Sequence, residues 1–203
     1  EFLQNTYWGN VHYTLKIQIL LTYPLSICAT SHFPLVSAPQ HQPDQPMQKY
    51  AVIVAGGSGS RMKSEIPKQF MEVAGKPILF HTISLFHEFN KSSQILVTLP
   101  ESWLNYWEEL INTYQFDVPH QVIAGGQERF HSIKNALQHC IEPIVMVHDG
   151  VRPLVSKETL NRCVMALEDY NAVIPVVPVK ESLRRLSGQQ SEGLIRSEYR
   201  NVQ

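Results

Sequence analysis

Apolar runs and amphipathic stretches alternate along this chain from residue 50 onward. The apolar runs are short and rich in β-branched residues, as is typical of buried strands, at 50–54, 94–99, 120–124, 144–147 and 172–179. The stretches between them place apolar residues at helical spacing, at 77–89, 103–114, 130–139 and 157–169. This alternation predicts an α/β fold of Rossmann-like type, with a mostly parallel sheet and helices on both faces. In such sheets, ligands bind beyond the carboxyl ends of the strands.

The first 46 residues do not follow this pattern. Their charged side chains are only Glu1, Lys16 and Asp44, and they contain five prolines. The apolar run 17–25 is broken by polar and proline residues, too short for a membrane span and too far along the chain for a signal peptide. We therefore expect no membrane contact.

Two boundaries follow from this contrast. We expect residues 1–46 to be a non-domain N-terminal extension, disordered or upstream sequence, that does not pack into the sheet. We expect residues 47–203 to form the working domain, which is incomplete at its C-terminal end because Gln203 closes the chain inside an ongoing segment.

Composition narrows the class of protein. The chain has 203 residues, with 17 basic and 18 acidic side chains, which suits one globular domain and gives no support for a nucleic-acid surface. Cys28, Cys140 and Cys163 are isolated in the sequence, so we expect free thiols in a reducing, cytoplasmic setting and neither a disulfide frame nor a zinc site.

A glycine loop follows the first apolar run. It carries Gly56, Gly57 and Gly59, and glycine backbone can pass close to a ligand with its N–H groups toward phosphate oxygens. Arg61 and Lys68 come next, so the segment favours a polyanion, most simply a triphosphate. The spacing is neither that of a Walker A loop nor that of a Rossmann dinucleotide loop.

Two further motifs close later strands. Gly125-Gly126 precedes a helix whose first turn carries Ser132, a hydroxyl that can bind a ligand or cap the helix. Asp149 ends the strand 144–147, where its carboxylate could hold Mg²⁺ or ribose hydroxyls, or act as a simple turn cap. His148 has no other histidine at ligand spacing, and we interpret it as structural.

The string Ala55-Gly56-Gly57-Ser58-Gly59-Ser60-Arg61-Met62, followed by Pro67-Lys68-Gln69-Phe70, resembles the signature of sugar-phosphate nucleotidyltransferases. The Pro-Lys-Gln segment is similar to that of the cytidylyltransferases acting on 2-C-methyl-D-erythritol 4-phosphate, and the resemblance runs from about Met47 to Gln203. It implies transfer of CMP from CTP to that acceptor, giving 4-diphosphocytidyl-2-C-methyl-D-erythritol and pyrophosphate. It also implies Mg²⁺ as cofactor and a homodimer.

The resemblance assigns a role to each matching position. It implies two catalytic cations, Arg61 and Lys68. It implies CTP binding by Ala55, Gly56, Gly57, Ser58, Gly59, Gly125, Gly126, Ser132 and Asp149, the last also a possible Mg²⁺ ligand. It implies acceptor binding by Arg152, Ser182 and Arg196, the last often supplied to the neighbouring subunit's site.

The chain departs from the family pattern at a few positions. Gln127 stands where family members often carry an acidic residue, and Gly150-Val151 replaces two alanines beside Asp149. Two other interpretations stay open at this point. The acceptor could be ribitol 5-phosphate or another polyol phosphate, or the chain could be an inactive CTP-binding module.

Overall fold

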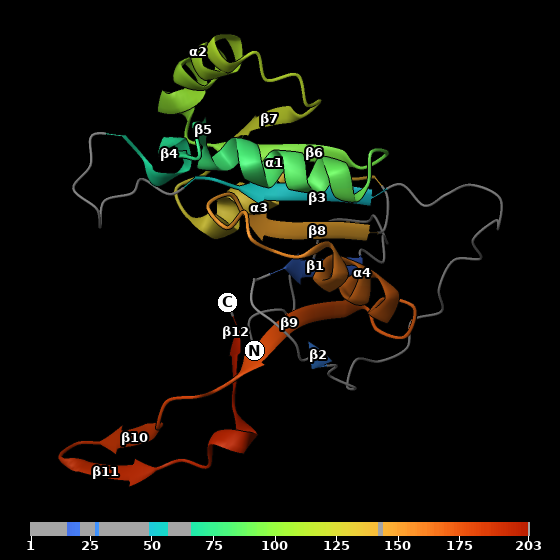
Figure 1. Cartoon of the computed structure of the whole chain (residues 1–203). Helices are drawn as coiled ribbons and strands as arrows, with labels where there is room; N and C mark the ends of the chain where they lie inside the picture. Colours follow the sequence, from blue (N-terminus) through green and yellow to red (C-terminus); the bar gives the residue numbers. More distant parts are fainter. Residues whose placement is uncertain (1–15, 21–26, 29–48, 57–65, 142–143, 203) are drawn as a thin grey trace.

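A mostly parallel sheet with helices on both faces forms the body of the molecule, as the sequence predicted (Figure 1). The structure, a computed structural model, describes residues 16–20, 27–28, 49–56, 66–141 and 144–202. Across the sheet the strands follow the order β12 (Arg200–Val202), β9 (Ala172–Pro178), β1 (Lys16–Leu20), β8 (Ile144–Asp149), β3 (Lys49–Val54), β6 (Gln94–Leu99) and β7 (Gln121–Ala124). A two-residue strand, β2 (Ile27–Cys28), pairs with β9 away from this path.

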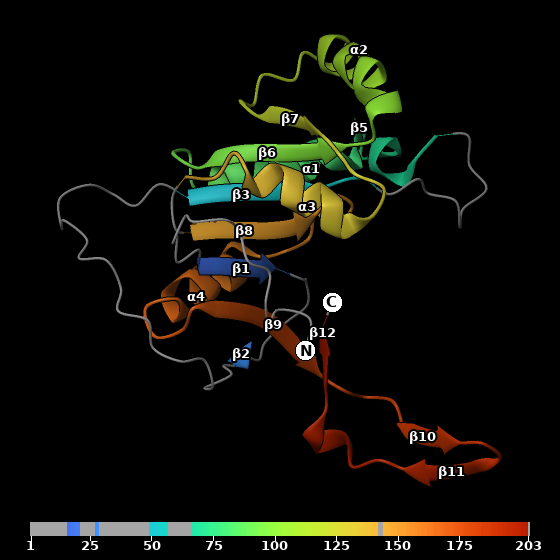
Figure 2. The same cartoon turned by 180° about the vertical axis from the view of Figure 1, so that it is seen from behind.

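Both faces of the central strand β3 are buried, because its side chains alternate between two apolar clusters. Ala51 and Ile53 pack in the larger cluster, with α1 (Ile78–Phe89), α2 (Leu104–Tyr114) and α4 (Lys157–Ala166). Tyr50 and Val52 pack in the smaller cluster on the other face, under α3 (Arg129–Leu137). Figures 1 and 2 show α1 and α3 on opposite sides of the sheet. No helix in the described part of the chain is long and apolar enough to cross a bilayer.

The N-terminal segment departs from expectation. Residues 16–20 form β1, which lies inside the sheet and pairs in parallel with β8 and with β9. β2 pairs antiparallel with β9. The expectation that residues 1–46 stay out of the sheet is therefore wrong for these two strands. The reason is that the edges of β8 and β9 offer backbone hydrogen-bond partners to any extended segment, whatever its composition.

The loops at the carboxyl ends of four strands are tied together by backbone hydrogen bonds. Ala55 N donates to Thr98 O at 3.0 Å, and Gly125 N donates to Leu99 O at 2.7 Å. Gly150 N donates to Val54 O at 2.8 Å. These bonds continue the ladder past the strands β3, β6, β7 and β8, so the loops that carry the predicted motifs start from fixed positions.

An arm extends from the body near the C-terminal end of the described residues (Figures 1 and 2). It consists of the antiparallel strands β10 (Arg184–Ser187) and β11 (Gln190–Gly193), all of whose residues are exposed. The chain then returns to the body through a short 3₁₀ turn, Arg196–Glu198, and β12, which pairs antiparallel with β9. A second small hairpin, β4 (Glu72–Val73) with β5 (Lys76–Pro77), precedes α1.

Candidate active site

The glycine loop begins where β3 ends. Ala55 is buried and Gly56 is partly buried. A Cβ on Gly56 would lie 3.1 Å from the hydroxyl oxygen of Ser132, so a side chain there would crowd the neighbouring turn. The predicted loop residues that follow lie outside the described part of the chain; these are Gly57, Ser58, Gly59 and Arg61.

A short turn that carries Lys68 follows the glycine loop in the sequence. The 3₁₀ turn Lys68–Phe70 is closed by a bond from Phe70 N to Pro67 O at 3.0 Å. Lys68 is exposed, while Gln69 is only 2% exposed and Phe70 only 3%. The Gln69 side-chain amide donates to Ala55 O at 2.8 Å, which brings the Lys68 turn next to the start of the glycine loop.

The Gly125-Gly126 turn and Ser132 lie beside Gly56. Ser132 Oγ accepts a hydrogen bond from Gly126 N at 3.0 Å and donates one to Glu128 O at 3.3 Å. A Cβ on Gly126 would lie 2.2 Å from the Cβ of His131, so only glycine fits there. Ser132 is 1% exposed. Its hydroxyl thus holds the Gly125-Gly126 turn and lies close to Gly56. Direct contact between Ser132 and a nucleotide stays a prediction.

Asp149 lies at the end of β8 between two arginines. Its Oδ1 accepts from Arg129 Nη2 at 2.7 Å, and its Oδ2 accepts from Arg152 Nε at 3.1 Å. Two guanidinium charges and one carboxylate leave a net positive charge at the strand end, which suits an anionic ligand.

Arg129 is the residue here that sequence reasoning did not single out. It begins α3 and bridges that helix to β8, from the glycine turn of one strand to the acidic end of another. The sequence held one signal, its place in the Gly-Gly-Gln-Glu-Arg string, but nothing in the string names its partner.

Asp149 is the donor that could hold a divalent cation. Among the residues that the structure describes, no group of three or more His, Cys, Asp or Glu side chains is arranged to bind a metal. Mg²⁺ is usually held in proteins by one or two carboxylates together with substrate phosphates. A lone Asp149 fits that pattern if Arg129 gives up its place on Oδ1.

His148 is structural in its surroundings, as the sequence indicated. It is fully buried, and its ring lies 5.0 Å from that of Phe86 on α1. Burial lowers the pKa of His148 to about 4, outweighing the Asp149 carboxylate, which raises it.

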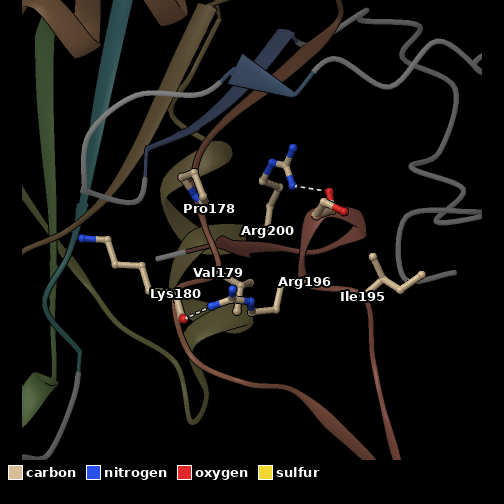
Figure 3. A pocket seen from close by; sticks show the side chains of 7 residues that line it. Pro178, Val179, Lys180, Ile195, Arg196 and Arg200 are labelled. Atoms are coloured by element: carbon tan, nitrogen blue, oxygen red, sulfur yellow. Dashed lines mark hydrogen bonds between the residues drawn. The ribbon is translucent and has the colours of Figure 1, made fainter.

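The predicted acceptor residues fall into two groups. Arg152 joins Asp149, as described above. Arg196 lines a pocket of about 690 Å³ between β9 and the 3₁₀ turn before β12, together with Lys180 and Arg200 (Figure 3). The Arg196 guanidinium donates to Lys180 O at 2.6 Å (Figure 3). Ser182 is exposed in the segment that leads from β9 into the arm.

Known proteins with similar sequences belong to one enzyme family. The sequence profile of the 2-C-methyl-D-erythritol 4-phosphate cytidylyltransferase family matches residues 49–203. A protein of that name from Bacteroides thetaiotaomicron is 46% identical over 158 residues, which are 77% of this chain and 72% of the relative. One from Porphyromonas gingivalis is 45% identical over 157 residues, covering 77% of this chain and 70% of the relative.

Solved structures agree. A 2-C-methyl-D-erythritol 4-phosphate cytidylyltransferase from Thermus thermophilus matches at a TM-score of 0.55 and 26% identity, over 77% of this chain and 68% of that one. A 4-diphosphocytidyl-2C-methyl-D-erythritol synthase from Anaerococcus prevotii matches in fold at a TM-score of 0.63 and 21% identity, over 77% of this chain and 67% of that one. The motif strings, the strand-end site and these matches converge: the chain belongs to the 2-C-methyl-D-erythritol 4-phosphate cytidylyltransferase family.

Proposed function

We propose that this protein transfers CMP from CTP to 2-C-methyl-D-erythritol 4-phosphate, giving 4-diphosphocytidyl-2-C-methyl-D-erythritol and pyrophosphate. The observation that carries the proposal is the position of Lys68. It is the exposed member of an otherwise buried turn, and this turn is bonded to Ala55 at the start of the glycine loop. A cation fixed beside a loop of backbone N–H groups is what phosphoryl transfer requires.

The chemistry needs positioning more than proton transfer. A phosphate oxygen of the acceptor attacks the α-phosphorus of CTP, the bond from that phosphorus to the bridging oxygen breaks, and pyrophosphate leaves. The nucleophile is already an anion, so the protein has to bring two anions together and stabilise the extra charge on the α-phosphate. Lys68 and Arg61 supply fixed positive charge for this, and the glycine-loop backbone holds the β- and γ-phosphates.

Mg²⁺ completes the charge balance in this proposal. When bound, it neutralises charge on the phosphates and holds them in one arrangement. Asp149 would hold it on the protein side, together with phosphate oxygens. Arg152 then remains as the partner of the second carboxylate oxygen.

The two substrates lie at the carboxyl ends of different strands. The backbone of Gly125-Gly126, held by Ser132, faces the cytosine, and Asp149 lies near the ribose and phosphates. Ser182 and Arg196 bind the acceptor's phosphate. Support for this placement comes from the basic pocket that contains Arg196, Lys180 and Arg200.

We also propose a homodimer in a reducing, cytoplasmic setting. The arm formed by β10 and β11 projects from the body (Figure 1). Leu186 on the arm is 75% exposed, and Ile195, just after it, is 64% exposed. Exposed apolar groups on a projecting arm favour contact with a second copy. Cys140 is a free thiol.

A coupled assay tests the function. With Mg²⁺, CTP and 2-C-methyl-D-erythritol 4-phosphate, we expect pyrophosphate release and the CDP-linked product. ATP in place of CTP, and ribitol 5-phosphate in place of the acceptor, should give far less product. CTP binding without turnover would identify an inactive nucleotide-binding module, and preference for ribitol 5-phosphate would replace the acceptor.

The variant Lys68→Ala tests whether this lysine contributes to catalysis. We expect turnover to fall by about 10² or more, the usual size for loss of one preorganised charge. CTP affinity should change less, because the loop backbone still holds the phosphates. Lys76→Ala removes another exposed lysine, on the nearby hairpin, and serves as the matched control. A folded Lys68→Ala variant with normal turnover would leave Arg61 as the catalytic cation.

A further inference from the structure

The turn that presents Lys68 is held from the inside by its neighbours. Pro67, Gln69 and Phe70 are all buried, whereas Lys68 between them is exposed. Backbone bonds from Phe70 N to Pro67 O and from Met71 N to Lys68 O, at 3.0 and 3.1 Å, close the turn. The backbone of Lys68 therefore has little freedom to move independently of the buried residues on either side.

Gln69 fastens this turn to the sheet. Its Nε2 donates to Ala55 O at 2.8 Å, and both residues are buried. Ala55 is itself fixed, because its N–H donates to Thr98 O at 3.0 Å. A hydrogen bond in such a water-poor place is stronger than one in solvent, and its loss leaves a buried carbonyl short of a partner.

The two residues joined by this bond lie on either side of the glycine loop in the sequence. Ala55 precedes the glycine loop and Lys68 follows it, so the Gln69 amide joins the two ends of the segment that would surround the triphosphate. The bond thereby holds the backbone of the Lys68 turn against Ala55, the residue at which the glycine loop begins.

Phe70 anchors the other side of the turn. Its ring lies 5.5 Å from Trp103 and 5.3 Å from Tyr106, in the aromatic cluster of α2 and the turn before it. Phe70 shares a buried apolar cluster with Ala55, and this packing sets the depth of the turn. The Gln69 amide adds a directed hydrogen bond to the Ala55 carbonyl.

We propose that Gln69 is a positioning residue for nucleotidyl transfer, which sets the place of Lys68 relative to the phosphates without touching either substrate. The proposal rests on the function and the role of Lys68 proposed above. Its physical basis is that a stabilising charge acts in the transition state only where it is already in place, so that a misplacement of about 1 Å costs about 10²-fold in rate.

A double-mutant cycle is the test. Gln69→Met keeps the length of the side chain and removes the amide donor. We expect it to lower kcat by about 10- to 100-fold, up to the loss that a misplacement of about 1 Å produces. CTP affinity should change by less than about 3-fold, because the loop backbone is retained. Adding Lys68→Ala to Gln69→Met should then cost much less than Lys68→Ala costs in the wild-type chain, since the charge is already misplaced.

Thr82→Val is the matched control. Thr82 is buried, and its hydroxyl donates to Gly150 O at 2.8 Å, so it also ties a helix side chain to a carbonyl at the strand ends, but beside Asp149. Its effect and that of Lys68→Ala should add, because Thr82 does not support the Lys68 turn.

Gln69→Glu gives a second readout that a merely structural role would not produce. A buried carboxyl has a raised pKa, and only its protonated form can donate to Ala55 O. The activity of Gln69→Glu relative to wild type should therefore rise as the pH is lowered, while the ratio for Gln69→Met stays flat. This variant also keeps the test available if Gln69→Met melts before the assay temperature.

Additive effects of Gln69→Met and Lys68→Ala, or a folded Gln69→Met with normal kcat, would overturn the proposal. So would a Gln69→Glu ratio that does not depend on pH. A wild-type chain that releases no pyrophosphate would overturn the proposed function itself, and the two failures are thus distinguishable.

Discussion

At the scale of single residues, His148 places an ionisable ring in the core next to the site. Its pKa is lowered from 6.5 to about 4, chiefly because burial disfavours the charged form. The unfolded chain therefore takes up a proton near pH 6.5, and the folded chain does so only near pH 4. Stability from this group is complete above pH 6.5 and is lost as the pH falls through this window.

We expect the free energy of unfolding to fall by roughly 3 kcal/mol between about pH 7 and about pH 4 because of His148. His120 acts in the same direction, since desolvation lowers its pKa as well. Urea unfolding at several pH values between about 4 and 7 measures how the free energy of unfolding changes with pH. His148→Leu should flatten this dependence, whereas His139→Leu, at an exposed position after α3, should not. An equal slope in wild type and His148→Leu would contradict the assignment.

Arg129 gives a second prediction at this scale. Its guanidinium bonds Oδ1 of Asp149, the carboxylate that we propose as the Mg²⁺ ligand. Arg129→Gln should lower the Mg²⁺ concentration for half-maximal turnover by about 5-fold, which corresponds to losing an exposed ion pair of about 1 kcal/mol. Arg162→Gln on α4 makes the same change of charge away from this site and should leave the Mg²⁺ requirement unchanged. A higher Mg²⁺ requirement in Arg129→Gln would show that the arginine assists the cation.

The residue types at the site could be predicted from sequence, but their pairing could not. The strings that contain Lys68, Ser132 and Asp149 each have a recognisable chemistry. The bonds of Arg129 to Asp149 and of Gln69 to Ala55 join residues 20 and 14 positions apart. Such contacts depend on which strands become neighbours, and no local pattern encodes this.

At the scale of elements, α2 supports the site through an aromatic cluster. Trp107 is almost fully buried and lies against the rings of Phe80 and Phe70, at centroid distances of 5.1 and 6.1 Å. Its indole N–H donates to His120 Nε2 at 3.2 Å. One side chain thus joins α1, α2 and the Lys68 turn.

Trp107→Ala should lower the free energy of unfolding by about 3–5 kcal/mol, because it opens a cavity at the centre of this cluster. Trp107→Phe should cost about 1–2 kcal/mol, since it keeps a ring and loses the bond to His120. Urea denaturation with fluorescence and circular dichroism measures both. A Trp107→Ala variant within 1 kcal/mol of wild type, on the scale of ordinary surface changes, would show that α2 is not part of the cooperative core.

The helices and core strands could be predicted because their apolar periodicity is strong, and their bounds agree to within a few residues. The apolar pattern does not predict the two hairpins, because their strands lack an alternation of apolar and polar residues. Their signals are in the turns: Ala74 and Gly75 both have positive φ, at 52° and 76°, and Gly188 has φ of 58°. Two-residue hairpin loops demand such backbone.

At the scale of the whole molecule, the sheet includes a strand from outside the region that matches the family. β1 separates β8 from β9, although the crossover through α4 would allow these two to be neighbours. We propose that the catalytic domain comprises residues 47–203. The composition of residues 1–46 did not predict β1. A strand can form between two others by backbone hydrogen bonding alone, and composition does not report such pairing.

A chain starting at Met47 should still bind CTP within about 3-fold of the full chain, since the strand-end loops are bonded to one another. Its melting temperature should fall by about 5 °C, because β8 and β9 lose a partner. Ile19→Pro in the full chain should have a similar effect, as proline cannot donate within a paired strand. Loss of CTP binding on truncation would place residues 1–46 inside the functional domain.

The aromatic cluster beside Lys68 also provides an intrinsic fluorescence probe of nucleotide binding. Of the three tryptophans in the chain, Trp103 and Trp107 both lie against Phe70, two residues from Lys68. Any shift of that turn on nucleotide loading changes the surroundings of both indoles together. The intrinsic fluorescence of these tryptophans should therefore report CTP occupancy directly, without a labelled nucleotide or a coupled enzyme.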